Sequence, residues 1–412
     1  MIPYTRKTLP NGLTVVVNRD RASKLAAVNI LYRVGARNEN PARTGFAHLF
    51  EHLMFRGTRA VENFDLPVQM ASGDNNAFTN NDYTDFYITL PKDNLETALW
   101  LESDRMEGLD ITPAKLEAEK KVVIEEFRQR YLNQPYGDQT MLLRALAYKV
   151  HPYRWAAIGL ATDHIAGATL ADVESFYRAH YRPSNAILSI SADMEEERML
   201  ELAEKWFGGL PDTPRPAAPI PQEPPQEAPR REEVERDVPA TTVTVAYRMG
   251  TRTSPDFYTA DLVSDLLSGG DSGRLYRHLV KERRLLSSVN AYVTGDLDPG
   301  LFVFTGQLLP GVAPEAAEAA FREEIEALRT APISQYETEK VKNKFEANTL
   351  FGELNVMNKA MNLGFYEMLG DLPLINGEVA RYRAVSDEDI RAFCRSTLRP
   401  ENASTLIYKA RK

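Results

Sequence analysis

Cysteine is almost absent from the sequence: Cys394 is the single one in 412 residues, so no disulfide can form within the chain. Its surroundings, RAFCRSTL, predict a small buried residue rather than a reactive thiol. A run of about 18 apolar residues is also missing, and we therefore expect no membrane-spanning helix. The start, MIPYTRKTLPNGLTVVV, lacks the pattern of a signal peptide. We expect a cytoplasmic protein, or a periplasmic one if a leader has been removed.

Basic residues are too few for a typical nucleic-acid-binding protein. The chain has 49 Lys and Arg against 58 Asp and Glu, a formal net charge of −9. Binding to phosphates needs clustered positive charge, so this balance argues against nucleic acid as a partner. The length predicts about two domains, because single cores rarely grow beyond roughly 250–300 residues.

Proline is concentrated in one segment, LPDTPRPAAPIPQEPPQEAPRREEVE. Such a segment favours extended conformations and does not build a packed core. We therefore predict a linker at 211–232, between an N-terminal domain at 1–210 and a C-terminal domain at 233–412.

The sequences on the two sides of this linker resemble each other. TLADVESFYRAHYRPSNAIL matches VSDEDIRAFCRSTLRPENAST, which aligns Arg182 with Arg399 at an offset of 217. LYRVGARNENP matches AYRMGTRTSPD, which aligns Arg33 with Arg248 at an offset of 215. Two matches at nearly the same spacing indicate a duplicated domain of about two hundred residues.

Each half combines strands with helices. LTVVVNRD and LAAVNILYRVG are typical of strands, and NAFTNNDYTDFYITLP predicts a hairpin with alternating side chains. Helices are predicted at 93–107 and 113–131. We expect an α+β fold in which helices pack on a largely antiparallel sheet.

The segment TGFAHLFEHLMFRGT contains two of the six histidines. A helix over 45–55 places its apolar side chains on one face and His48, Glu51 and His52 on the other. Histidines four residues apart lie one turn apart and can reach the same ion. A chance His-x-x-acid-His is expected in roughly one such sequence in a hundred. The alternative is a solvated polar face, and a third ligand is needed to decide.

A long helix in TPAKLEAEKKVVIEEFRQRY offers this third ligand. Thr112 suits the helix cap and Pro113 the first turn. The predicted packed side carries Leu116, Val122, Val123 and Phe127. Glu119 and Glu126 lie on that same side, whereas Glu117 and Glu125 point away. Burying carboxylates among valines is unfavourable unless a cation is close, and a metal ion held by His48 and His52 would supply that cation. Periodicity therefore favours Glu126 over its neighbour Glu125. A poorly buried helix with solvated acids is the alternative.

Two imidazoles and one carboxylate are a typical ligand set for catalytic zinc, with water in the fourth position. Zinc acidifies this water and polarises a carbonyl, and Glu51 is then available as the general base.

The order His-x-x-Glu-His is the inverzincin signature. Together with NAFTNNDYT, EKKVVIEEF and HPYRWAAIG, it resembles the pitrilysin family of zinc peptidases, in particular the branch of mitochondrial processing peptidase and its bacterial relatives. The resemblance implies one zinc ion per chain, held by His48, His52 and Glu126. It also implies Glu51 as the base and Glu119 as an auxiliary acid near the metal.

The resemblance further implies how substrate binds. Asn76, Ala77 and Phe78 match the edge strand on which an extended peptide adds as another strand. In the family, the two domains form a half-shell, and two half-shells enclose a chamber that excludes folded proteins. The implied activity is therefore the hydrolysis of short or unfolded peptides.

The second half departs from the family's catalytic pattern. Asp261, Ser264 and Asp265 stand where the first half has His48, Glu51 and His52, so we expect no zinc there. Family members that cleave alone carry an Arg and a Tyr seven residues apart, where this chain has Lys281 and Ser288. This difference implies a heterodimer with a zinc-free homologous subunit that carries the Arg and Tyr, with a homodimer as the alternative. A non-catalytic subunit of a larger complex and a hydrolase acting on another substrate class are the competing functions.

Overall fold

A computed structural model describes residues 1–212 and 218–411. The chain forms two compact units, each assembled from several segments. Unit 1 comprises Met1–Arg128, Trp155–Ile220 and Leu350–Gly377, and unit 2 comprises Gln129–Arg154, Pro221–Thr349 and Glu378–Lys412. The expected domains are continuous in sequence, and that division stays a prediction. Residues 213–217 of the expected linker lie outside the described residues.

Unit 1 contains a six-stranded sheet in the order β1-β2-β6-β3-β5-β4. Its strands are β1 (Thr5–Thr8), β2 (Thr14–Arg19), β3 (Leu25–Tyr32), β4 (Asp74–Thr79), β5 (Thr84–Pro91) and β6 (Ala186–Ala192). β2 pairs with β6 in parallel, and the other neighbours are antiparallel. The predicted hairpin is confirmed as β4 and β5.

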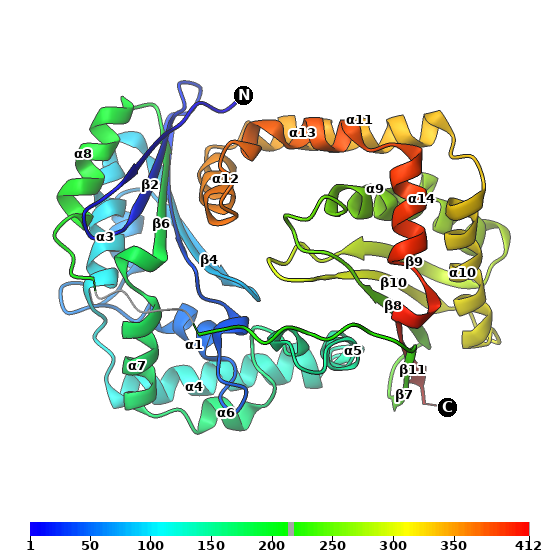
Figure 1. The fold of residues 1–412 in the computed structure, drawn as a ribbon. Helices are drawn as coiled ribbons and strands as arrows, with labels where there is room; N and C mark the ends of the chain where they lie inside the picture. Colours follow the sequence, from blue (N-terminus) through cyan, green and yellow to red (C-terminus); the bar gives the residue numbers. More distant parts are fainter. Residues whose placement is uncertain (213–217, 412) are drawn as a thin grey trace. The chain divides into compact units, whose positions relative to one another are not determined.

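Helices cover both faces of this sheet, which explains why β6 is buried along its whole length. α3 (Leu95–Glu107) and α8 (Glu196–Phe207) lie on one face, and α12 (Val356–Met368) lies on the other (Figure 1). Gly364 permits the close approach of α12. A Cβ atom at this position would lie 2.8 Å from Oδ1 of Asn29 on β3 and 3.1 Å from Oγ of Ser189 on β6.

Unit 2 repeats the topology of β2 to β6 with five strands. Its sheet has the order β7-β11-β8-β10-β9, in which β7 and β11 are parallel and the other neighbours antiparallel. The strands are β7 (Arg230–Arg236), β8 (Thr242–Arg248), β9 (Leu286–Val293), β10 (Leu301–Leu308) and β11 (Ala403–Ala410). Matched asparagines also make the same contact. The Asn185 side chain donates to the carbonyl of His180 and that of Asn402 to the carbonyl of Thr397, both at 2.8 Å. The expected α+β class, with helices on largely antiparallel sheets, is confirmed.

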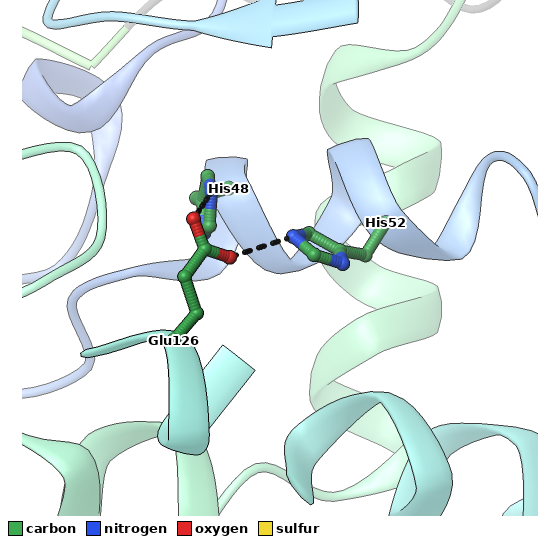
Figure 2. A group of neighbouring side chains, drawn as sticks. All are labelled: His48, His52 and Glu126. Atoms are coloured by element: carbon green, nitrogen blue, oxygen red, sulfur yellow. Dashed lines mark ion pairs between the residues drawn. The ribbon is translucent and has the colours of Figure 1, made fainter. Parts of the chain in front are cut away.

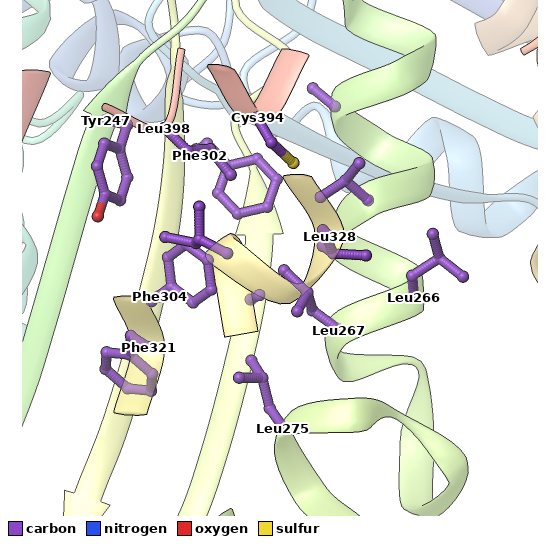
Figure 3. Close-up of a cluster of buried hydrophobic side chains, with 14 of the residues drawn as sticks. Tyr247, Leu266, Leu267, Leu275, Phe302, Phe304, Phe321, Leu328, Cys394 and Leu398 are labelled. Carbon is purple, nitrogen blue, oxygen red and sulfur yellow. The ribbon is translucent and has the colours of Figure 1, made fainter. Parts of the chain in front are cut away.

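The core of unit 2 lies between its sheet and three helices, α9 (Phe257–Ser268), α10 (Pro314–Thr330) and α14 (Asp387–Ser396). Figure 3 shows Cys394 among its leucines and phenylalanines. The cysteine is 0% exposed, as the sequence predicted.

The remaining helices include α1 and α4, which carry the site described below. They are α1 (Phe46–Leu53), α2 (Asp65–Met70), α4 (Pro113–Phe127), α5 (Gln139–Ala147), α6 (Thr162–Ala166), α7 (Leu170–His180), α11 (Gln335–Gly352) and α13 (Leu374–Ala384). Among the helices of residues 1–212 and 218–411, none has both the length and the apolar character needed to cross a bilayer.

Candidate metal centre

The first element of the site is α1, which begins at Phe46 and ends at Leu53 within the predicted range. Its apolar face is fully buried against the rest of unit 1, which fixes the rotation of the helix. The same rotation turns His48, Glu51 and His52 to the other side. The two imidazole rings lie one turn apart, with centroids 4.9 Å from each other.

The second element is α4, which begins at Pro113. The Thr112 hydroxyl accepts a hydrogen bond from the Lys115 backbone at 3.2 Å, so the predicted cap is confirmed. Val122, however, is 44% exposed, and its assignment to the packed side was wrong. It precedes the buried Val123, and successive side chains are about 100° apart around a helix. Val122 therefore lies outside the packed face of α4.

α1 and α4 bring His48, His52 and Glu126 together (Figure 2). One ligand atom from each lies within 4.8 Å of the others. Nε2 of His48 is 3.7 Å from Oε1 of Glu126, and Nε2 of His52 is 3.2 Å from Oε2 of Glu126. Metal–ligand distances of about 2.0–2.1 Å in a tetrahedron require ligand atoms roughly 3.3 Å apart. The donor set and its spacing therefore fit a zinc ion.

Glu119 contacts the other side of His52. Its Oε2 lies 3.4 Å from Nδ1 of His52, and its Oε1 lies 2.5 Å from Nη2 of Arg56. Burial lowers the pKa of His52, but hydrogen bonds and charges from Glu119 and Glu126 outweigh this and raise the pKa to about 9. The two carboxylates thus favour positive charge at His52, and Glu119 contacts a residue of the possible metal group without belonging to that group.

Glu51 lines a cavity of about 990 Å³ beside the metal site, within unit 1. His52, Arg56 and Glu119 also contribute to its wall. The sequence prediction missed the rest of the lining, which includes Phe55, Val61, Leu66, Pro67, Trp100 and Lys115. No local pattern could have indicated these residues, because they come from three stretches that lie apart in the sequence, 55–67, Trp100 and Lys115.

The predicted substrate-binding residues Asn76, Ala77 and Phe78 lie on β4, at the end of the sheet order. β4 pairs with β5 on one side and contacts α1. Within the described part of the chain, no strand pairs with its outer side. A sheet edge therefore lies close to the helix that carries both histidines.

Comparison with known proteins identifies the family. The family model described as "Insulinase (Peptidase family M16)" matches residues 14–155, and "Peptidase M16 inactive domain" matches residues 167–345. The zinc protease PqqE of Helicobacter pylori is 33% identical over 341 residues, which cover 81% of this chain and 77% of the relative. The chain belongs to peptidase family M16.

Other M16 relatives agree with this assignment. A probable mitochondrial-processing peptidase subunit beta of Arabidopsis thaliana is 25% identical over 315 residues, 73% of this chain and 59% of that protein. The crystal structure of a protease from Helicobacter pylori has a TM-score of 0.95 and 29% identity, and the match covers 99% of this chain and 100% of that one. The expected family is therefore confirmed.

The inactive-domain match of this M16 chain includes Asp261, Ser264 and Asp265 on α9. Asp265 pairs with Nζ of Lys344 at 2.7 Å, and Asp261 accepts a hydrogen bond from the Tyr382 hydroxyl at 2.7 Å. The Lys344 ammonium group and the Tyr382 hydroxyl thus provide partners for these two carboxylates. Of the residues that the structure describes, only His48, His52 and Glu126 bring three possible metal-ligand atoms within 4.8 Å of one another.

Proposed function

We propose that this M16 chain is a zinc-dependent endopeptidase that holds one zinc ion through His48, His52 and Glu126. The observation that carries the proposal is the convergence of these three groups at spacings that suit tetrahedral zinc. The relative from Helicobacter pylori is named a zinc protease, which supports the same activity.

The protein groups have separate roles in the proposed reaction. When bound, zinc supplies a Lewis acid that polarises the peptide carbonyl and acidifies a water molecule. Glu51, which lies between the two histidines and lines the cavity, accepts the proton of the attacking water. It then delivers this proton to the leaving amide nitrogen. Glu119 holds Nδ1 of His52, so that Nε2 is directed at the ion.

Short or unfolded peptides are the proposed substrates. An extended peptide binds along β4 near Asn76, Ala77 and Phe78, because the outer side of this strand offers backbone donors and acceptors. Recognition through the backbone requires an unfolded segment and tolerates varied side chains. One substrate side chain would enter the 990 Å³ cavity beside Glu51.

We also propose that the active form is a heterodimer with a homologous zinc-free subunit, the two enclosing a chamber. Lys281 and Ser288 occupy the positions at which self-sufficient family members carry Arg and Tyr, so the partner would supply this pair. The Arabidopsis relative is named as a subunit of mitochondrial-processing peptidase, which supports an assembly of this kind. A homodimer is the alternative.

The test is cleavage of a quenched peptide library, with and without chelator, by the chain alone and with its zinc-free homologue. We expect cleavage that chelator abolishes and that the homologue strongly increases. Cleavage by the zinc-loaded chain that chelator leaves intact would refute the zinc mechanism. A complete lack of cleavage with every candidate partner would instead indicate that the chain is a non-catalytic subunit of a larger complex.

A further inference from the structure

The helix that carries both histidines has no capping side chain of its own. α1 is preceded by Gly45, which adopts φ +90° and has no side chain to accept a hydrogen bond. Helices usually begin with Ser, Thr, Asp or Asn, whose oxygen accepts from the backbone of the first turn. Such a residue cannot replace Gly45, because a Cβ atom would lie 2.6 Å from the carbonyl oxygen of Ile158.

Glu39 provides the missing acceptors from outside the helix. Its Oε2 accepts a hydrogen bond from the backbone N–H of Gly45, and its Oε1 accepts one from the backbone N–H of Ala47, each at 2.9 Å. The residue is only 6% exposed, so water cannot easily replace either contact. Burial raises the pKa of this carboxyl group to about 8, although the two backbone hydrogen bonds lower it, so the carboxylate with two full acceptors predominates above that pH.

The position of Glu39 is itself fixed by the segment HPYRWAAIG. The indole N–H of Trp155 donates to the carbonyl of Ala36 at 3.1 Å, and the backbone N–H of Glu39 donates to the same carbonyl at 3.3 Å. Gly159, with φ +103°, packs directly on Gly45. This segment therefore contacts both the turn that carries Glu39 and the residue that precedes the helix.

We propose that Glu39 is a positioning residue for the metal site, acting as a remote cap that fixes the first turn of α1. His48 directly follows Ala47 and is the third residue of the helix, whereas His52 lies one turn further on. If the first turn frays, His48 moves relative to His52. Zinc sites tolerate errors of only about 0.2 Å in ligand distance, so zinc affinity depends on this cap. This inference rests on the proposed zinc site.

The test compares zinc dissociation constants of Glu39→Gln and Glu39→Ala, measured by competition with a chromophoric chelator. The measurements are made at pH 9, where the Glu39 carboxylate presents an acceptor on both oxygens, whereas the carboxamide presents one acceptor and one donor, and alanine presents neither. We expect Glu39→Gln to weaken zinc binding about tenfold and Glu39→Ala more strongly. Substitutions of residues that support metal ligands typically weaken metal binding 10–100-fold.

Ser386→Ala is the matched control. Ser386 caps α14 in unit 2, where it accepts a hydrogen bond from the Asp389 backbone. Its loss should lower the thermal unfolding temperature but leave zinc affinity unchanged. If Glu39→Ala does not fold, Glu39→Gln and Glu39→Asp decide the matter. Wild-type zinc affinity in the folded Glu39 variants would overturn this inference alone, whereas a wild-type chain that binds no zinc would overturn the proposed function as well.

Discussion

Nδ1 of His52 lies 3.4 Å from Oε2 of Glu119, a carboxylate that is 1% exposed. The second oxygen of this carboxylate contacts Arg56, whose side chain is half exposed and lines the cavity. A guanidinium, a carboxylate and an imidazole thus form a chain that ends at the proposed ion. Because the Glu119 carboxylate is buried, removing Arg56 should change the contact between Glu119 and His52.

Arg56→Met should weaken zinc binding about tenfold, because Glu119 loses the cation that compensates its charge and directs it at His52. Arg56→Lys keeps a positive charge and serves as the matched control, with a smaller effect. The measurement is chelator competition at constant pH. Equal zinc affinities in Arg56→Met and wild type would show that Glu119 needs no such partner.

His48→Ala and Glu51→Gln should separate metal binding from chemistry. His48→Ala removes one of three proposed ligands, so the purified protein should contain no stoichiometric zinc. Glu51→Gln leaves the ligands intact but cannot accept a proton, so zinc should remain while peptide cleavage falls by at least a hundredfold. Metal analysis and cleavage rates of the same preparations test both statements. Substantial activity in Glu51→Gln would exclude Glu51 as the base.

The double variant Lys281→Arg, Ser288→Tyr should increase peptide cleavage by the isolated chain. Ser288 is exposed on β9, and Lys281 lies on the helical turn Tyr276–Glu282, so both substitutions can be accommodated without disturbing the core. The measurement is the cleavage rate without any partner. Each single variant is a control, because the pair is expected to act together. An unchanged rate would contradict the proposal that the chain needs a partner because it lacks this Arg and Tyr.

Cys394 should react with a thiol reagent only when unit 2 unfolds. Burial raises the pKa of its thiol to about 12, and nearby arginines lower it by less. An unfolded cysteine has a pKa of about 8.5, so at pH 8 the thiolate forms only in the unfolded chain.

For the same reason, the thiol ionises first in the unfolded state, and its contribution to stability falls as pH rises above about 8.5. Labelling rates in buffer and in denaturant check the expectation, with Cys394→Ala as the blank. Rapid labelling of the folded protein would contradict it.

The sequence predicted several features because they depend on neighbours along the chain. Helical periodicity separated Glu126 from Glu125, and a side-chain acceptor before a proline located the start of α4 at Thr112 and Pro113. The same periodicity was less reliable at the edge of a stripe, where Val122 lies outside the buried face.

The sequence by itself determined the chemical character of this protein: two imidazoles on one helix face, a carboxylate on another helix, a duplicated α+β pattern and membership of a peptidase family. Tertiary structure alone decided that Glu119 supports His52, that Arg56 supports Glu119, and that Glu39 caps α1. The reason is physical. Periodicity and capping act over a few residues, whereas these contacts join segments brought together only when the apolar faces of the helices are buried.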